Sequence, residues 1–235
     1  MARRRFFASA CDGARARIDG ESAHHLTRVL RVQPGQEYEL AWKGALYLGR
    51  IESARTGAVE LTVTAQLAAP QPESALELAA AIFKFDRFEW MLEKATELGM
   101  TRLWPVVSRR SDPRLAAAAA ARARRWRQIA LSAAEQSRRA TCPDIAAALS
   151  LAALLAHPFA GQRLLLSEAK DAPAMAGAAP PLRLLLGPEG GWSEEEASAA
   201  AAAGYRPVSL GGRILRAETA ALAALALSGS ALVAG

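Results

Sequence analysis

The chain has 235 residues, 51% of them hydrophobic and 22% charged, which is typical of a globular protein with one large or two modest domains. Its 29 Lys and Arg outnumber its 23 Asp and Glu, and the net charge of +6 favours a polyanionic partner, although a GC-rich genome also enriches Arg and Ala. A disulfide framework and a zinc site are excluded, because Cys11 and Cys142 lie far apart and His24, His25 and His157 lack metal-ligand spacing.

No targeting or membrane-spanning segment is predicted. The N-terminal MARRRFF is basic, but no apolar core follows it as in a signal peptide. Residues 219–235 are apolar but interrupted by Ser228, Gly229 and Ser230, which leaves them short of the roughly 20 residues that span a bilayer. We therefore expect a cytoplasmic protein with no membrane association and no metal, whose last apolar segment is a core helix.

The first 70 residues favour a small β-rich domain. Five segments alternate apolar and polar residues in the manner of strands: 5–8, 14–18, 36–41, 46–53 and 58–66. The segment Ser22–Leu30 is expected to be a helix, with Leu26, Val29 and Leu30 on its apolar face. Several short strands separated by turn signals predict a small barrel.

A polar, proline-bearing linker at 68–74 is expected to separate a domain of residues 1–70 from one of residues 75–235. The run Leu76–Phe83 is apolar throughout, which is typical of a strand covered on both faces. Strand and helix patterns then alternate to the end of the chain. This alternation predicts an α/β domain with a mostly parallel sheet.

The first helix of this second domain is expected at Lys84–Gly99. Asp86 and Glu89 have capping-box spacing, and Gly99 is a C-terminal stop signal. The apolar residues recur at helical intervals and are expected in the core rather than in a site.

A second, alanine-rich helix is expected at Leu115–Ser137. Trp126 and Ile129 lie on its predicted buried stripe, while its arginines cover too much of the circumference to form a single face. Pro143 is expected to end this helix. Further elements are expected as strands at 102–107 and 164–167 and a short helix at 149–156.

Two glycine-containing turns near the C-terminus each follow a short apolar run and precede a helix. In LLLGPEGGWSEE the strand Leu184–Leu186 ends at the first glycine, and Ser193 with Glu196 forms a capping box that begins a helix at about Glu194. In VSLGGRILRAET a strand at 208–210 precedes the glycines, and a helix begins at about Glu218. Loops at the carboxyl ends of strands are where open α/β sheets bind ligands.

Charge and spacing narrow the kind of ligand. Neither loop carries the Lys-Ser/Thr of a phosphate-binding P-loop or the Gly-x-Gly-x-x-Gly of a dinucleotide site. Glu189 in the first loop would repel a pyrophosphate, so an adenosine cofactor with a cationic centre fits better. The alternative is that both are ordinary strand-to-helix turns, but the recurrence of the same form favours a site.

LLLGPEGGWSEEE and LGGRILRAETAALAAL closely resemble the C-terminal signature of the ribosomal RNA small subunit methyltransferase E family, which belongs to the SPOUT class. Looser matches are HHLTRVLR, the lysine-then-helix segment that ends in ELG, and EQSRR. The resemblance implies a PUA-like N-terminal β-barrel that holds RNA, a SPOUT methyltransferase domain with a deep trefoil knot, and a homodimer. It also implies S-adenosyl-L-methionine as cofactor, 16S rRNA of the small ribosomal subunit as partner, and methylation of N3 of a uridine in the decoding region.

The sequence departs from the family pattern at three positions. Phe85 replaces a small or polar residue, Arg109 replaces an acidic one, and Arg138 replaces a small one. We expect Phe85 to change the loop after the lysine and Arg109 to remove a salt bridge of the family. Arg138 is expected to change the local backbone.

We expect the cofactor to lie against the two loops and a neighbouring strand end: Ser167, Leu186, Gly187, Pro188, Glu189, Gly190, Gly191, Leu210, Gly211, Ile214, Leu215, Arg216 and Thr219. The candidate RNA contacts are Arg4, Arg5, Arg28, Arg31, Lys84 and Arg139, although a solvated basic face explains most of them equally well.

Arg216 and Glu218 are the candidate catalytic residues. Uracil N3 carries a proton, so methylation needs a base or a stabiliser of the uracil anion. We assign Arg216 to the negative charge on the uracil oxygens, while Glu218 orients Arg216 or accepts the proton. An acid favoured by the helix dipole is an equally good explanation of Glu218. Alternative functions are a non-catalytic RNA-binding paralogue, an α/β enzyme with a nucleotide cofactor, and a SPOUT enzyme that methylates another RNA or base.

Overall fold

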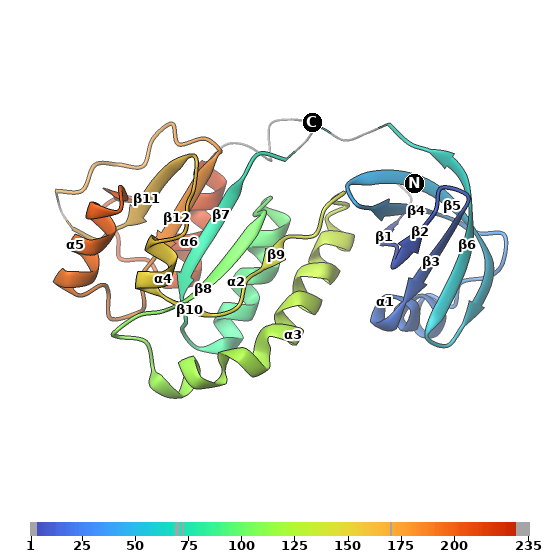
Figure 1. Ribbon diagram of the computed structural model, residues 1–235, viewed down its shortest axis with the longest axis horizontal. Helices are drawn as coiled ribbons and strands as arrows, with labels where there is room; N and C mark the ends of the chain where they lie inside the picture. The colour runs from blue at the N-terminus through green and yellow to red at the C-terminus, as the bar shows by residue number, and fades with distance from the viewer. Residues whose placement is uncertain (1–3, 69–70, 72, 170, 229–235) are drawn as a thin grey trace. The chain divides into compact units, whose positions relative to one another are not determined.

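The computed structural model describes residues 4–68, 71, 73–169 and 171–228 (Figure 1). Part of the expected linker, at 69, 70 and 72, and the end of the last apolar segment, at 229–235, lie outside the described residues. The chain divides into two compact units. Unit 1 contains Met1–Pro72 and Leu131–Cys142, and unit 2 contains Glu73–Ala130 and Pro143–Gly235.

Unit 1 is built on a six-stranded sheet around its own apolar core. Its strands are β1 (Arg5–Phe7), β2 (Ala10–Cys11), β3 (Arg15–Asp19), β4 (Glu37–Trp42), β5 (Ala45–Arg55) and β6 (Ala58–Gln66), in the order β1-β4-β5-β6-β3-β2. Strands β1 and β4 pair in parallel and the other pairs are antiparallel. Alternating side chains such as Ile18, Ile51 and Leu61 fill the core. The mixed sheet agrees with the expected β-rich domain, and closure into a barrel stays a prediction.

The helical segment of unit 1 departs from regular α-helix. It consists of α1 (Gly20–His24) followed by the π-helix η1 (His25–Val29). Leu26 is buried as expected, but Val29 is 66% exposed, so its predicted place on the apolar face was wrong. The i→i+5 bond from the Leu30 amide to the His25 carbonyl explains this, because a π-turn rotates later residues off the 3.6-residue period.

Residues 131–142 belong to unit 1, although the sequence had placed them in the second domain. They include the last residues of α3 (Pro113–Gln136). Glu135 Oε1 accepts hydrogen bonds from Ser22 Oγ at 2.9 Å and from the Phe7 amide at 3.3 Å. The helix ends at Gln136 rather than at Pro143, because Arg138 has a left-handed backbone with φ of +56°. This conformation suits a small residue, which explains why the Arg138 departure matters.

Unit 2 contains a seven-stranded sheet in which every described pairing is parallel. Its strands are β7 (Leu76–Ala81), β8 (Arg102–Val107), β9 (Asp144–Ile145), β10 (Leu149–Ser150), β11 (Gln162–Leu166), β12 (Leu182–Leu186) and β13 (Arg206–Val208). The order is β10-β8-β7-β12-β11-β13, with β9 paired to β8. All residues of β7 and β12 are buried. The predicted mostly parallel α/β sheet is confirmed.

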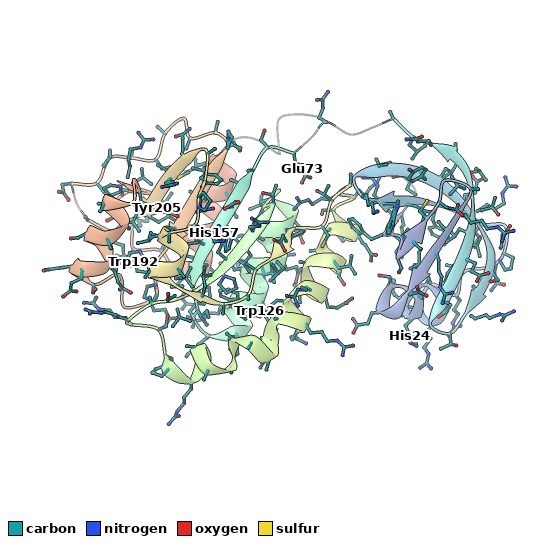
Figure 2. The ribbon with its side chains drawn as sticks, in the orientation of Figure 1. His24, Glu73, Trp126, His157, Trp192 and Tyr205 are labelled. Carbon is teal, nitrogen blue, oxygen red and sulfur yellow. The ribbon has the colours of Figure 1, made fainter. Side chains whose placement is uncertain are left out.

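Helices cover both faces of this sheet. One core joins α2 (Phe85–Glu97), α3 and α6 (Ala217–Leu227) to side chains such as Leu184, while the other joins α4 (Leu151–Leu155) and α5 (Glu194–Ala202) to side chains such as Leu185. Figure 2 shows Trp126 on α3, where its ring packs against Phe88 with centroids 4.9 Å apart. Successive residues of a strand point to opposite faces of the sheet, so neighbouring residues join different cores. This pattern is typical of a sheet that is buried on both sides.

The predicted capping box of α2 was wrong. Lys84 is the N-cap and makes no side-chain cap, and the Glu89 carboxylate instead pairs with Arg125 at 2.6 Å and Arg122 at 3.2 Å. Charge-assisted hydrogen bonds from two guanidinium groups of α3 stabilise this nearly buried carboxylate more than a single bond from a backbone amide would. Asp86 remains in the first turn, where a negative charge suits the helix dipole.

A buried ion pair lies between neighbouring central strands. The Arg183 guanidinium, on β12, donates to Glu77 of β7 at 2.6 Å, and the Trp104 indole donates to the same carboxylate at 2.8 Å. Arg183 is 1% exposed. Carbonyls of His157 and Pro158 also accept from it, so the buried charge is both paired and hydrogen-bonded.

Candidate functional site

The carboxyl ends of the parallel strands bring several loops of unit 2 to one edge of the sheet. Residues 187–193 follow β12, residues 209–216 follow β13, and α2 begins soon after β7. The segment after β11 runs parallel to the chain at Ser209, just after β13: the Met175 amide donates to the Ser209 carbonyl, and the Ser209 amide donates to the Pro173 carbonyl, each at 2.8 Å. Both glycine loops therefore lie at the ligand-binding edge of an open α/β sheet.

The first loop is a tight turn that leads into α5. The Gly191 amide donates to the Pro188 carbonyl at 2.8 Å, and Gly191 has a φ of +70°. The predicted capping box is confirmed, because Ser193 and Glu196 each accept from the other's backbone amide. Trp192, labelled beside α5 in Figure 2, packs so closely on Gly187 that a Cβ there would lie 3.0 Å from its indole nitrogen.

The second loop is open. Apart from the adjoining residues, no atom of the described chain lies within 4 Å of a Cβ built on Gly211 or Gly212, and Gly211 has a φ of +109°. Ile214 is 85% exposed, and Arg216, the N-cap of α6, is also exposed. The open backbone leaves room for a ligand to approach the chain.

A small cluster of charges joins the two loops to α2. The Arg87 guanidinium lies 2.9 Å from Glu189 of the first loop and 3.9 Å from Glu218 in the first turn of α6. Glu218 is buried, and its Oε2 has no hydrogen-bond partner in the part of the chain that the structure describes. An adjacent pocket of about 350 Å³ is lined by Asp86, Arg87, Trp90, Arg216, Glu218 and Thr219.

The structure brings most of the predicted cofactor residues to this edge. Leu186 and Pro188 are buried, whereas Glu189, Gly190 and Thr219 are exposed. The Ser167 side chain accepts from the Ala169 amide, and its own amide donates to Val208, so it lies between β11 and β13. Leu210 and Leu215 are partly buried.

The two predicted catalytic residues line the same pocket, but Glu218 pairs with Arg87. No hydrogen bond or ion pair of the Arg216 side chain is found among the described residues. Of the two roles proposed for Glu218, orienting Arg216 therefore has no contact to support it in this structure.

The predicted RNA contacts are dispersed. Arg4, Arg28, Arg31 and Lys84 are exposed, with Lys84 in unit 2 and the others in unit 1. Arg5 is paired with Glu39 at 2.7 Å, and its other terminal nitrogen donates to the Arg138 carbonyl. Arg139 is 7% exposed and belongs to unit 1, and its place near the substrate stays a prediction.

Four residues of the site were not predicted as site residues: Asp86, Arg87, Trp90 and Arg110. Arg110 donates to the Gly190 carbonyl at 2.6 Å, and Trp90 is 48% exposed. Their position could have indicated them, because each belongs to a loop or to the first helical turns that follow the carboxyl end of a parallel strand.

Arg109 forms a salt bridge with Glu195 at 3.2 Å, although the acidic residue typical of the family is replaced here. Its backbone amide also donates to the Glu196 carboxylate.

Comparison with known proteins identifies the family of this chain. Residues 70–229 match the model of an RNA methyltransferase domain, and residues 18–64 match that of an RNA methyltransferase PUA domain. A Synechocystis ribosomal RNA small subunit methyltransferase E is 36% identical over 214 residues, covering 86% of this chain and 69% of its own. The protein of that name from Mycobacterium bovis is 32% identical, with 92% and 87% covered. This chain belongs to the ribosomal RNA small subunit methyltransferase E family.

Solved structures of similar proteins contain the cofactor. A methyltransferase E from Neisseria gonorrhoeae bound to S-adenosyl methionine has a TM-score of 0.84 and 32% identity, with 96% of each chain covered. A Legionella pneumophila protein in complex with the same cofactor has a TM-score of 0.87 and 26% identity, with 96% of each chain covered. The cofactor of this methyltransferase E family member is S-adenosylmethionine.

The residues present fit that cofactor. A buried polar atom beside the first loop, the Trp192 indole N–H, has no hydrogen-bond partner among the described residues. The cofactor carries both hydrogen-bond acceptors and donors, and its sulfonium charge suits a site with Glu189, Glu218 and Asp86 nearby. In the described part of the chain, no helix has the length and apolarity to cross a bilayer, and no cluster of His, Cys, Asp or Glu is suited to a metal ion.

Proposed function

We propose that this protein methylates N3 of a uridine in the decoding region of 16S rRNA. The observation that carries the proposal is the pairing of groups at one pocket: the exposed donor Arg216 beside the buried, partnerless acceptor Glu218 Oε2. The Watson–Crick edge of uracil has an N3–H donor between two carbonyl acceptors. A donor and an acceptor side by side complement that edge.

The side chains of the pocket have separate roles in the proposed reaction. Arg216 donates to a uracil oxygen and stabilises the negative charge that develops as N3 loses its proton. Glu218 Oε2 accepts that proton, so N3 can use its electron pair to bond the incoming carbon. The cofactor supplies an electrophilic methyl group on a positively charged sulfur, which leaves as a neutral thioether. The chain's main task is to hold base and cofactor in line.

The two glycine loops, with Ser167 and Thr219, are proposed to hold the cofactor. Gly211 and Gly212 leave their backbone open to a ligand, and Gly190 faces only the Arg110 side chain. Because N3 is occupied in a base pair, the target uridine must be unpaired before it enters the pocket. The exposed Arg4, Arg28 and Arg31 of unit 1 and Lys84 of unit 2 are proposed phosphate contacts. Action on ribosomal RNA implies a cytoplasmic location.

A homodimer and a trefoil knot complete the proposal. Trp90 on α2, Leu227 on α6 and Ile214 in the second loop are large apolar side chains that are about half exposed or more, and α2 packs against α6. Exposed apolar surface of this kind is typical of an interface, and a second chain there would cover the pocket. The trefoil knot is proposed from the family alone; the segment after β11 pairs in parallel with Ser209 beside the second loop.

Replacing Arg216 with Ala tests the catalytic assignment. We expect the turnover number for 16S rRNA in small subunits to fall at least about a hundredfold, because a charge-stabilising donor is lost. Affinity for S-adenosylhomocysteine, measured by calorimetry, should stay within about threefold of the wild-type value. Unchanged turnover, or loss of cofactor affinity equal to the loss of rate, would refute the assignment.

A further inference from the structure

We propose that Arg87 is a positioning residue that acts through Glu218, holding its carboxylate so that Oε2 faces the ligand. The inference deepens the proposed function and rests on it, because it takes Glu218 as the group that receives the proton of the base. Arg87 lies on α2, and nothing in the sequence motifs of the two glycine loops points to it.

The burial of the three charged groups shows where Arg87 matters most. The Glu189 side chain is 52% exposed, so its ion pair with Arg87, although only 2.9 Å long, is weakened by solvent. The Glu218 side chain is 10% exposed, and Arg87 is the cation paired with it in the described chain. A buried carboxylate that loses its cation is left uncompensated, which costs far more than breaking a surface pair.

The two oxygens of Glu218 have different surroundings. Arg87 Nε lies 3.9 Å from Oε1, whereas Oε2 has no partner although it is shielded from solvent. An unpartnered buried acceptor needs a donor. The other charged groups of the pocket are Asp86 and Arg216. Asp86 is an acceptor, and no hydrogen bond or ion pair joins Arg216 to Glu218 in the described chain. The missing donor is therefore assigned to the ligand, and an N–H group such as uracil N3–H has the required chemistry.

Arg87 also contacts the first cofactor loop through Glu189. One guanidinium thus connects the loop that holds the cofactor with the carboxylate that faces the base. Arg87 contacts neither the base nor the reacting methyl in this scheme, and its pair with Glu189 is weakened by solvent. Its removal should therefore change the rate mainly through Glu218. This is what separates a positioning residue from a catalytic one.

A double-mutant cycle tests the proposal. Arg87→Gln should lower kcat about tenfold, which corresponds to about 1.4 kcal/mol, with little change in KM for the cofactor. The same substitution made in Glu218→Gln should have almost no further effect, because residues that act as a unit are not additive. Arg87→Lys should restore part of the rate. The matched control is Arg124→Gln, an exposed arginine of α3 outside the site, which should leave kcat unchanged.

A second cycle on the unliganded protein keeps the inference separate from the proposed function. Melting temperatures should show coupling between Arg87 and Glu218, and a smaller coupling between Arg87 and the half-exposed Glu189. If the wild-type protein fails to methylate 16S rRNA, the proposed function is wrong. The melting-temperature cycle still tests whether Arg87 and Glu218 form an ion pair. Additive effects of Arg87→Gln and Glu218→Gln on both kcat and melting temperature would overturn the inference.

Discussion

The glycines of the two cofactor loops differ in how strongly the fold constrains them, either by close packing or by a positive φ. Gly187 is confined by Trp192, and Gly191 needs its positive φ, so substitutions there disturb the fold as well as any ligand. Gly190 has neither restriction: a Cβ would meet the Arg110 side chain at 3.5 Å, an ordinary contact. A loss of cofactor affinity on substituting Gly190 would therefore reflect a clash with the ligand rather than a disturbed fold.

Gly190→Ala is expected to leave the melting temperature close to the wild-type value and to weaken S-adenosylhomocysteine binding about tenfold, because the methyl group occupies space that the cofactor needs. Calorimetry measures the affinity. Gly212→Ala is the control for the fold, since no atom lies within 4 Å of its Cβ position. Wild-type affinity in Gly190→Ala would remove this residue from the cofactor site.

Among the elements, the capping boxes of α5 and α2 show when a sequence motif decides local structure. Ser193 and Glu196 form their box, and the Glu196 side chain also accepts a hydrogen bond from the Arg109 amide at 2.8 Å. Asp86 and Glu89 have the same spacing, but two arginines of α3 take Glu89. A local motif is reliable only where tertiary charge pairing does not compete with it.

Ser193→Ala should lower the free energy of unfolding by about 1 kcal/mol, the usual loss for an N-cap hydroxyl. Urea unfolding followed by circular dichroism measures it. Ser198→Ala, at an exposed position inside α5, is the control and should be neutral or slightly stabilising because alanine is the better helix former. Equal effects of the two substitutions would mean that the cap contributes nothing.

For the molecule as a whole, Glu135 links the stability of unit 1 to pH. Burial raises the pKa of Glu135 from 4.5 to about 7, and the hydrogen bonds from Ser22 and Phe7 only partly oppose this. An acid with a raised pKa in the folded state binds its proton more tightly there. Its contribution therefore favours folding below pH 4.5 and is lost as the pH rises to about 7.

Glu135→Gln should accordingly stabilise the protein more at pH 8 than at pH 5, by a difference of up to about 3 kcal/mol. Glutamine keeps an acceptor oxygen for Ser22 but never has to carry a buried charge. Unfolding curves at the two pH values measure the difference. The exposed Glu21→Gln serves as control, and the same pH dependence in both variants would contradict the assignment.

Periodicity predicted the parallel sheet, its long helices and both glycine loops, because these depend on local patterns of apolar residues and glycines. It did not predict that residues 131–142 pack with the N-terminal unit or that Arg183 is buried in a central strand, since both depend on partners distant in the sequence. In the site, the sequence motif pointed to Arg216 and Glu218, which line one pocket, and their catalytic roles stay a prediction. Arg87 was missed because its partners, Glu189 and Glu218, are more than 100 residues away along the chain.

Mass spectrometry of 16S rRNA from a strain that lacks the gene tests the central claim most directly. The account predicts the loss of one N3-methyluridine from the decoding region, restored by the wild-type gene but not by the Arg216→Ala variant. A full complement of N3-methyluridine in the deletion strain, or the loss of a different methylated nucleotide, would contradict it.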